Sequence, residues 1–477
     1  MKQIFKLIIL VVVVVISSCE DLEEEPKGLL APSVYYSSVS QIEAVLAASM
    51  NKVWSPWSVY GHGWGKFVND DQLWGGDLII TPNWADDLWN CHYGALLNLN
   101  TALDRVNAGS VQGASQEDID LLIGQIKIIR AWNYFMLVRM FGDVPLYLED
   151  DDPAVNPEAR ATVKEIYTQI VSDLTDAVAK LPATWPSEKH ARPTNGTAKG
   201  LLAKVYITMA TAPLNETENY AKAAEMAKSV MNDGIYSLEY NVEDVFLEEN
   251  KYGPEILWTF CSTEDDKTTM PQTWGPSYAP YNGWMDFCAD AHWDTLYPQQ
   301  PRKDAYLMRY SNGVPYTEWP TGGRGPSIKK MLTMSLDDYN SWSSDANLPI
   351  LRYADVLLLF AEAENMSKGG PTQEAVDAVN MIINRANGYV PNDNEPLLTT
   401  SMTKEDFDKA VIQERNLELC FEYDRWFDIC RKRILPDVCY RQKQLDNYTV
   451  DDYLFPIPEA DLRLNELLVQ NPGYPIP

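Results

Sequence analysis

Residues 352–387 read RYADVLLLFAEAENMSKGGPTQEAVDAVNMIINRAN, and they give the strongest local indication of the fold. Two helical segments, 352–366 and 373–387, are separated by a short run with two glycines and a proline, which interrupts a helix. Thr372 stands directly before the second segment, where its hydroxyl can cap the first turn. That segment carries apolar side chains at helical spacing, namely Val376, Val379, Ile383 and Ala386. The stretch therefore predicts a hairpin of two packed helices.

Similar helical segments recur along the chain. Residues 121–141 are apolar almost all round, as in a helix buried on most sides, and a glycine and a proline then end it. Residues 198–209 and 220–232 predict a second hairpin with a face of small side chains, and Thr403 can cap a further helix. We expect one mainly α domain, 19–477, built as a tetratricopeptide-like stack of helical hairpins with few short strands.

Two long stretches, approximately 51–93 and 235–349, are irregular and rich in glycine, proline, asparagine and aromatic residues. Loops of this length are usually functional rather than connective. We expect both to be ligand-binding insertions in the helical frame. Within the second insertion, 255–260 and 327–331 are predicted to be short strands.

The N-terminus has the features of an export signal. Lys2 and Lys6 precede an uninterrupted apolar run, 7–16, and two serines then lead to Cys19. The run is too short to span a membrane, which takes about 20 apolar residues. We therefore expect 1–18 to be a lipoprotein signal peptide and Cys19, at the cleavage point, to be lipidated. Several acyl chains on this residue would anchor the protein stably to a membrane.

The chain is strongly acidic, since 68 Asp and Glu against 39 Lys and Arg give a formal net charge of -29. Such a surface repels nucleic acid and other polyanions. We therefore expect that the protein does not bind nucleic acid and that its ligand is neutral. Of the 7 cysteines, those other than Cys19 form no CxxC motif. Export permits disulfides, but buried free thiols are the simpler expectation.

Five segments, taken in order, resemble the SusD/RagB family of outer-membrane nutrient-binding lipoproteins of Bacteroidetes. The segments are Tyr35-Tyr36 with 43–50, IRAWNYFMLVRMFGDVP at 129–145, RYADVLLLFAEAE at 352–364, ERNLELCFEYDRWFDICR at 414–431, and the tail 455–474. The chain differs from the family pattern at Tyr423-Asp424, where Gly and then His are more common. The acidic run after Cys19 resembles the surface-export signal of lipoproteins in the same bacteria.

The resemblance implies a SusD-like fold and a lipid-anchored place on the cell surface, at the outer membrane. It also implies a non-enzymatic role, in which a shallow platform of loops binds a glycan and delivers it to a SusC-like TonB-dependent transporter. Oligopeptides are the alternative ligand, since part of the family resembles a peptide-capturing relative. The charges in 414–431 are expected to pair across packed helices rather than to be catalytic.

Aromatic residues gather in the two insertions, and sugar rings can stack on the flat face of an indole. Asn, Asp, Gln or Arg at the rim of such a surface would bind hydroxyl groups. Our ranked ligand-binding candidates are Trp74, Trp284 and Trp319, followed by Trp84, Trp274, Tyr281 and Trp293. Weaker polar candidates are Asp70, Asp71, Asn83, Asn282, Asp286 and Arg324. Stacking on three indoles gives roughly 3 to 4 kcal/mol, so we expect about millimolar affinity for a single contact region.

No catalytic motif stands out in the sequence. There is no nucleophile elbow, no HExxH helix and no phosphate loop, so a surface glycoside hydrolase is the least favoured alternative. Four scattered histidines do not indicate a transition-metal site, and the Cys288 and His292 pair is more simply coincidence or core. A structural Ca²⁺ held by acidic loop oxygens is possible by composition, but the sequence does not place it.

Overall fold

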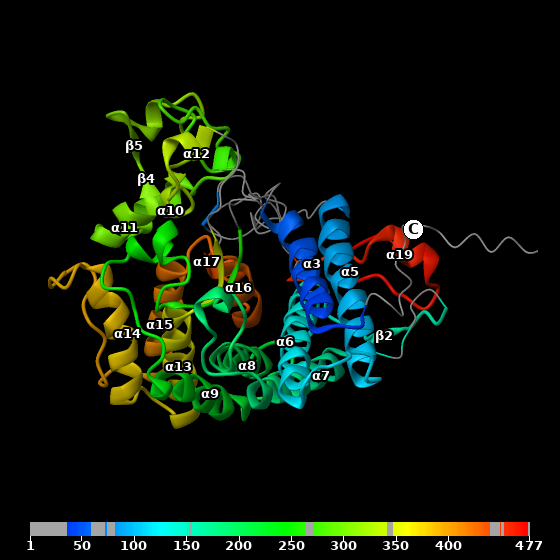
Figure 1. Ribbon diagram of the computed structural model, residues 1–477. Helices are drawn as coiled ribbons and strands as arrows, with labels where there is room; N and C mark the ends of the chain where they lie inside the picture. Colours follow the sequence, from blue (N-terminus) through cyan, green and yellow to red (C-terminus); the bar gives the residue numbers. More distant parts are fainter. Residues whose placement is uncertain are drawn as a thin grey trace, which may run out of the picture.

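The computed structural model describes residues 36–58, 72–73, 82–149, 151, 155–262, 271–340, 347–438, 449 and 453–475. Its long helices are α3 (Val39–Ser58), α5 (Pro82–Asn107), α6 (Gln116–Phe141), α7 (Val163–Lys180), α8 (Asn195–Met209), α9 (Asn219–Asp233), α13 (Tyr353–Lys368), α14 (Gln373–Ala386) and α15 (Lys404–Glu418). From α3 to α9 each of these helices packs on the next; α9 packs on α13, and α13 packs on α14 and α15. The predicted stack of helical hairpins is confirmed (Figure 1).

Helix ends follow the predicted capping residues. The Thr372 hydroxyl accepts the backbone N–H of Ala375 at 3.2 Å, and the Thr403 hydroxyl accepts that of Asp406 at 3.1 Å. Gly142 ends α6 with a φ of 72°, in the region that favours glycine. Each cap satisfies a backbone group that the helix itself leaves unpaired, so these boundaries follow from local chemistry.

Helix α6 is the core of the frame. By length and composition it could cross a membrane, but 83% of its most apolar window is buried inside the protein. Its buried Arg130 pairs with Asp173 of α7 at 2.7 Å and with Glu149 at 2.6 Å. The C-terminal tail covers its end, where the Phe455 backbone N–H donates to the Met140 carbonyl at 2.7 Å. The apolar character of α6 therefore serves packing.

The strands are short and pair in twos. β3 (Ile256–Phe260) pairs antiparallel with β8 (Leu348–Arg352), which confirms the first predicted strand to within one residue. β4 (Leu307–Met308) pairs with β7 (Ser327–Ile328), and a 3₁₀ turn, η6 (Lys329–Met331), follows, so the second predicted strand is shorter than expected. The remaining strand pairs are β1 (Val144–Pro145) with β2 (Arg160–Ala161), and β5 (Tyr310–Ser311) with β6 (Val314–Pro315).

The first insertion is narrower than the expected 51–93. Helix α3 continues to Ser58 and α5 begins at Pro82, because Trp54 and Trp89 are buried core residues of these helices. Aromatic residues that suggested a binding loop are thus partly the packed faces of two helices. Between the helices, Gln72 and Leu73 are the described residues.

Residues 271–340 of the second insertion build a small core together with Leu417, Cys420 and Phe421, and they stand above the frame in Figure 1. The second insertion contains three short helices, α10 (Ala291–Leu296), α11 (Pro301–Tyr306) and α12 (Leu336–Asn340). The C-terminal segment contains three more, α16 (Arg425–Lys432), α17 (Leu435–Val438) and α19 (Glu459–Leu464). Arg302 of α11 reaches into the frame, where its guanidinium lies 2.8 Å from the Glu418 carboxylate. A buried ion-pair cluster therefore fixes the insertion on α13–α15, which confirms that the charges in 414–431 pair across packed elements.

Candidate ligand-binding site

The two insertions meet at a short contact. Leu73 forms an isolated antiparallel bridge with Ala289, and the Asp290 backbone N–H donates to the Gln72 carbonyl at 2.8 Å. The Gln72 side chain donates to the Asn416 backbone carbonyl at 2.9 Å, at the end of α15. The residues that directly precede position 74 are therefore anchored both to the second insertion and to the frame.

Residues 271–290 form a tightly folded loop beside this contact. A Cβ on Gly283 would collide with the backbone oxygen of Gly275, and one on Gly275 would collide with the Tyr339 ring. The next residue, Trp284, donates its backbone N–H to the Gln272 carbonyl at 2.8 Å. The loop closes on itself only because two glycines leave room, and this closure sets the position of Trp284.

Trp284 is the most exposed indole of the described candidates, with 41% of its surface open to solvent. Asn282, with a φ of 51°, and Asp286 are exposed beside it in the same loop, and Tyr281 is half-buried. Burial raises the pKa of the Asp286 carboxyl, and the Arg324 guanidinium partly opposes this effect. We call Tyr281, Asn282, Trp284 and Asp286 the Trp284 ledge. An exposed apolar ring with an exposed amide and an exposed carboxyl two residues to either side along the chain suits a ligand with both C–H faces and hydroxyl groups.

Three of the predicted ligand-binding indoles are core residues in this structure. Trp274, Trp293 and Trp319 are 3%, 2% and 3% exposed. Trp293 packs at 5.3 Å, ring centre to ring centre, against Phe421, and the Trp319 indole N–H donates to the Val314 carbonyl at 3.0 Å. Our expectation that these rings face solvent is corrected, because the second insertion uses large aromatic side chains to build its own core.

Other candidates lie beyond what the structure describes. Trp74 and Cys19 fall outside the described residues, as do Asp70 and Asp71; α5 includes Trp84 and Asn83, but their side chains are not described. Arg324 is half-buried and Tyr281 packs edge-on against Tyr339 at 5.0 Å. Ligand contact by any of the predicted residues stays a prediction, and exposure favours Trp284 among the described ones.

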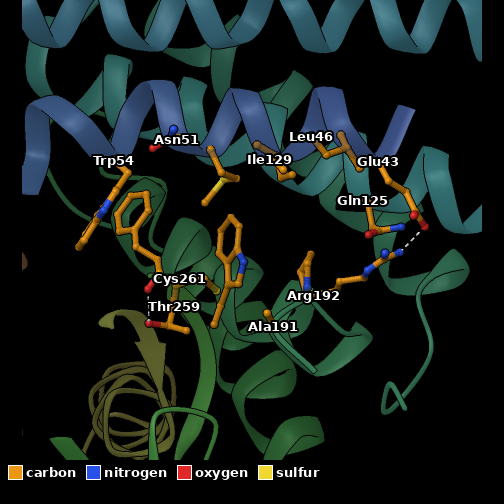
Figure 2. A pocket seen from close by; sticks show the side chains of 15 residues that line it. Glu43, Leu46, Asn51, Trp54, Gln125, Ile129, Ala191, Arg192, Thr259 and Cys261 are labelled. Atoms are coloured by element: carbon orange, nitrogen blue, oxygen red, sulfur yellow. Dashed lines mark hydrogen bonds and ion pairs between the residues drawn. The ribbon is translucent and has the colours of Figure 1, made fainter. Parts of the chain in front are cut away.

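A hollow separate from the Trp284 ledge lies between α3 and β3 (Figure 2). It has a volume of about 370 Å³ and is lined on one side by Leu46, Met50 and Trp54 of α3. On the other side lie Trp258 and Phe260 of β3, and the Phe260 ring is 4.8 Å from the Trp54 ring. This volume falls within the range of small-molecule pockets.

An ion pair closes one end of this hollow. The Arg192 guanidinium lies 2.5 Å from the Glu43 carboxylate, and this hydrogen bond, opposed by partial burial, lowers the pKa of Glu43. Sequence reasoning missed the hollow, because Trp54 was taken as a loop residue. The signal was present in the helical spacing of Val45, Leu46, Val53 and Trp54.

The described residues give little support to metal or acid-base chemistry. Among them, no group of three or more His, Cys, Asp or Glu side chains is arranged to hold a metal ion. The described cysteines are free thiols, and Cys91, Cys288 and Cys420 are buried, as expected for those three; Cys261 is exposed. The charged side chains of Glu414, Arg415 and Glu418 are buried in ion pairs. Each charge in such a cluster depends on its partners, because removal of one leaves another buried and uncompensated.

Comparison with known proteins gives two family matches. Residues 297–474 match a model described as the SusD family, and residues 57–207 match one described as "Starch-binding associating with outer membrane". The chain is 26% identical over 527 residues to SusD-like protein P2 of Formosa agariphila, covering 98% of this chain and 99% of that protein.

Solved structures share the fold over most of the chain. A SusD homolog from Bacteroides thetaiotaomicron superposes with a TM-score of 0.79 at 22% identity, covering 93% of this chain and 98% of that one. A laminarin-binding SusD-like protein gives a TM-score of 0.74 at 21% identity, covering 92% and 100%. At this level of identity the structures establish similarity of fold.

Proposed function

The chain belongs to the SusD/RagB family, and we propose that it captures a glycan at the outer-membrane surface and delivers it to a SusC-like TonB-dependent transporter. The observation that carries the proposal is the Trp284 ledge, on a loop joined to the first insertion at Leu73 and Ala289. A relative of the same fold is described as laminarin-binding, which supports a glycan as the ligand class.

The chemistry of the ledge favours a sugar. An indole that is 41% exposed offers an apolar face for axial C–H bonds, while Asn282 and Asp286 can bind hydroxyl groups. With 68 acidic side chains the protein repels polyanions, which favours a neutral glycan. We propose that capture involves no turnover, that the lipidated Cys19 holds the protein on the outer membrane, and that Trp74 and Trp84 extend the same binding surface.

Replacing the indole tests the proposal. Trp284→Ala should weaken binding of neutral polysaccharides about fivefold, because one stacked ring contributes about 1 kcal/mol. Affinity electrophoresis in gels that contain starch, laminarin, xylan or galactomannan measures this change. Leu336→Ala is the matched control, because Leu336 is a 39% exposed apolar residue of the same insertion, outside the loop.

The contrary outcomes are distinct. Equal retardation of wild type and Trp284→Ala in the gel that retards the wild type would remove the ledge from the binding site. No retardation of the wild type in any gel would count against a neutral glycan and direct attention to oligopeptides, which mass spectrometry of a co-purified ligand would identify.

A further inference from the structure

Two exposed tyrosines stack on each other at a site separate from the Trp284 ledge. The rings of Tyr240 and Tyr389 are 4.8 Å apart, centre to centre, and within 18° of parallel. Tyr240 is 70% exposed and Tyr389 is 47% exposed. The Tyr389 hydroxyl donates to the Tyr240 backbone carbonyl at 3.2 Å. The two rings thus form one continuous aromatic surface open to water, which makes the pair a candidate interaction site.

The end of α14 holds Tyr389 in place. Gly388 and Tyr389 have φ values of 63° and 61°, and the Tyr389 backbone N–H donates to the Asn384 carbonyl at 2.7 Å. A positive φ is uncommon for a bulky residue and persists only where the surroundings determine it. The tyrosine pair is therefore a preorganised platform, which lowers the entropic cost of binding a ligand.

A groove of about 610 Å³ runs beside the pair, between the start of α11 and the end of α14, which both lie on the left of Figure 1. Its polar lining residues are Asn241, Glu243, Gln299, Gln300, Asp304, Lys329 and the buried Arg385. The Lys329 ammonium donates to the Asp304 backbone carbonyl at 3.2 Å and lies 3.9 Å from the Glu243 carboxylate. The groove thus presents amides together with charges of both signs.

We propose that this groove is a second carbohydrate site, which binds a neutral, hydroxyl-rich glycan segment stacked on the tyrosine pair. The mixed charges disfavour a strongly anionic ligand. None of the residues that line the groove lies in a strand, so a peptide has no sheet edge there to extend. The inference takes its ligand class from the proposed function but rests on different residues.

Two sites on one protein predict bivalent binding of a long glycan. Linking two weak contacts through one polymer raises the overall affinity well above either alone. This arrangement would let the groove retain a polysaccharide while the Trp284 ledge engages another part of the same chain. The short oligosaccharides of the same glycan would instead occupy the two sites independently.

Calorimetric titration separates the sites. The probes are hexasaccharides from starch, laminarin, xylan and galactomannan, with the parent polymers tested in affinity gels. For a glycan that the wild type binds, we expect two hexasaccharides per protein molecule. The number should fall to one in the double variant Tyr240→Ala/Tyr389→Ala, and also to one in Trp284→Ala. Retention of the polymer should weaken on the order of tenfold or more in either variant. Met381→Ala is the control, because Met381 is 46% exposed on α14 and does not line the groove.

The outcomes distinguish this inference from the proposed function. A stoichiometry of one that the tyrosine variant leaves unchanged and Trp284→Ala abolishes would overturn the second site and support the ledge. Loss of binding in the tyrosine variant alone would support the groove and contradict the ledge. Absence of binding to every probe by the wild type would contradict both.

Discussion

Glu418 joins the second insertion to the helical frame. Its carboxylate accepts hydrogen bonds from Arg302 at 2.8 Å, from Arg352 at 2.7 Å and from Arg385 at 2.7 Å. Burial alone would raise the pKa of Glu418, but Arg385, Arg352 and Arg302 together hold it well below its usual range. The stabilisation is present above the unfolded carboxyl pKa of about 4.5 and is lost as pH falls toward the lower folded pKa.

We expect Glu418→Gln to lower the free energy of unfolding by about 3 to 5 kcal/mol, because it leaves buried guanidinium groups short of a counter-charge. Urea unfolding at pH 7 measures the change. Glu405→Gln on the same helix is the control, since the Glu405 side chain is 70% exposed. A loss no larger than that of the control would show that the other carboxylates compensate.

Single residues were harder to predict than their segments. The pairing of charges in 414–431 follows from packed helices, whereas the contribution of Arg302 comes from a distant insertion and has no local signal. Tyr423 stands where the family more often has glycine, and it adopts a φ of 69°. The turn thus places a non-glycine residue in the left-handed region, which suits a tyrosine less well than a glycine.

At the scale of elements, helices were predictable because their signals are local. Periodicity and caps located α6, α8, α9, α13, α14 and α15. The burial of side chains in the insertions was not predictable, because glycine, proline and aromatic residues indicate a loop without indicating which rings it buries. Trp274, Trp293 and Trp319 are core residues through contacts that only the folded insertion creates.

The closure of the 271–290 loop offers a test at this scale. Gly283→Ala should displace Trp284 and weaken glycan binding about as much as Trp284→Ala, because the added Cβ meets the Gly275 backbone. Overpacking of this kind costs about 1 to 3 kcal/mol of stability. Gly313→Ala is the control for strain alone, since its φ is 77° and a Cβ there meets open space. Unchanged binding by Gly283→Ala would mean that the loop does not position the ring.

In the whole molecule, the helical frame provides a rigid support and the insertions carry the proposed binding surfaces. A continuous helical stack gives a rigid body, and the second insertion is fixed on it by buried charges.

We expect a TonB-dependent β-barrel to accompany the protein when outer membranes are solubilised in mild detergent, because the proposed role requires delivery of the ligand. Mass spectrometry after affinity capture of the tagged protein would identify the barrel. Recovery of the protein without any barrel would contradict delivery through a transporter.

The most direct test of glycan capture is equilibrium dialysis of the full protein, at a concentration approaching millimolar, against a fluorescently labelled neutral oligosaccharide from a glycan of the gel panel. We predict that intact label accumulates on the protein side of the membrane and that the label retains its original length after prolonged incubation. A label that distributes equally between the two sides for every glycan, or one that is shortened to smaller fragments, would contradict capture without turnover.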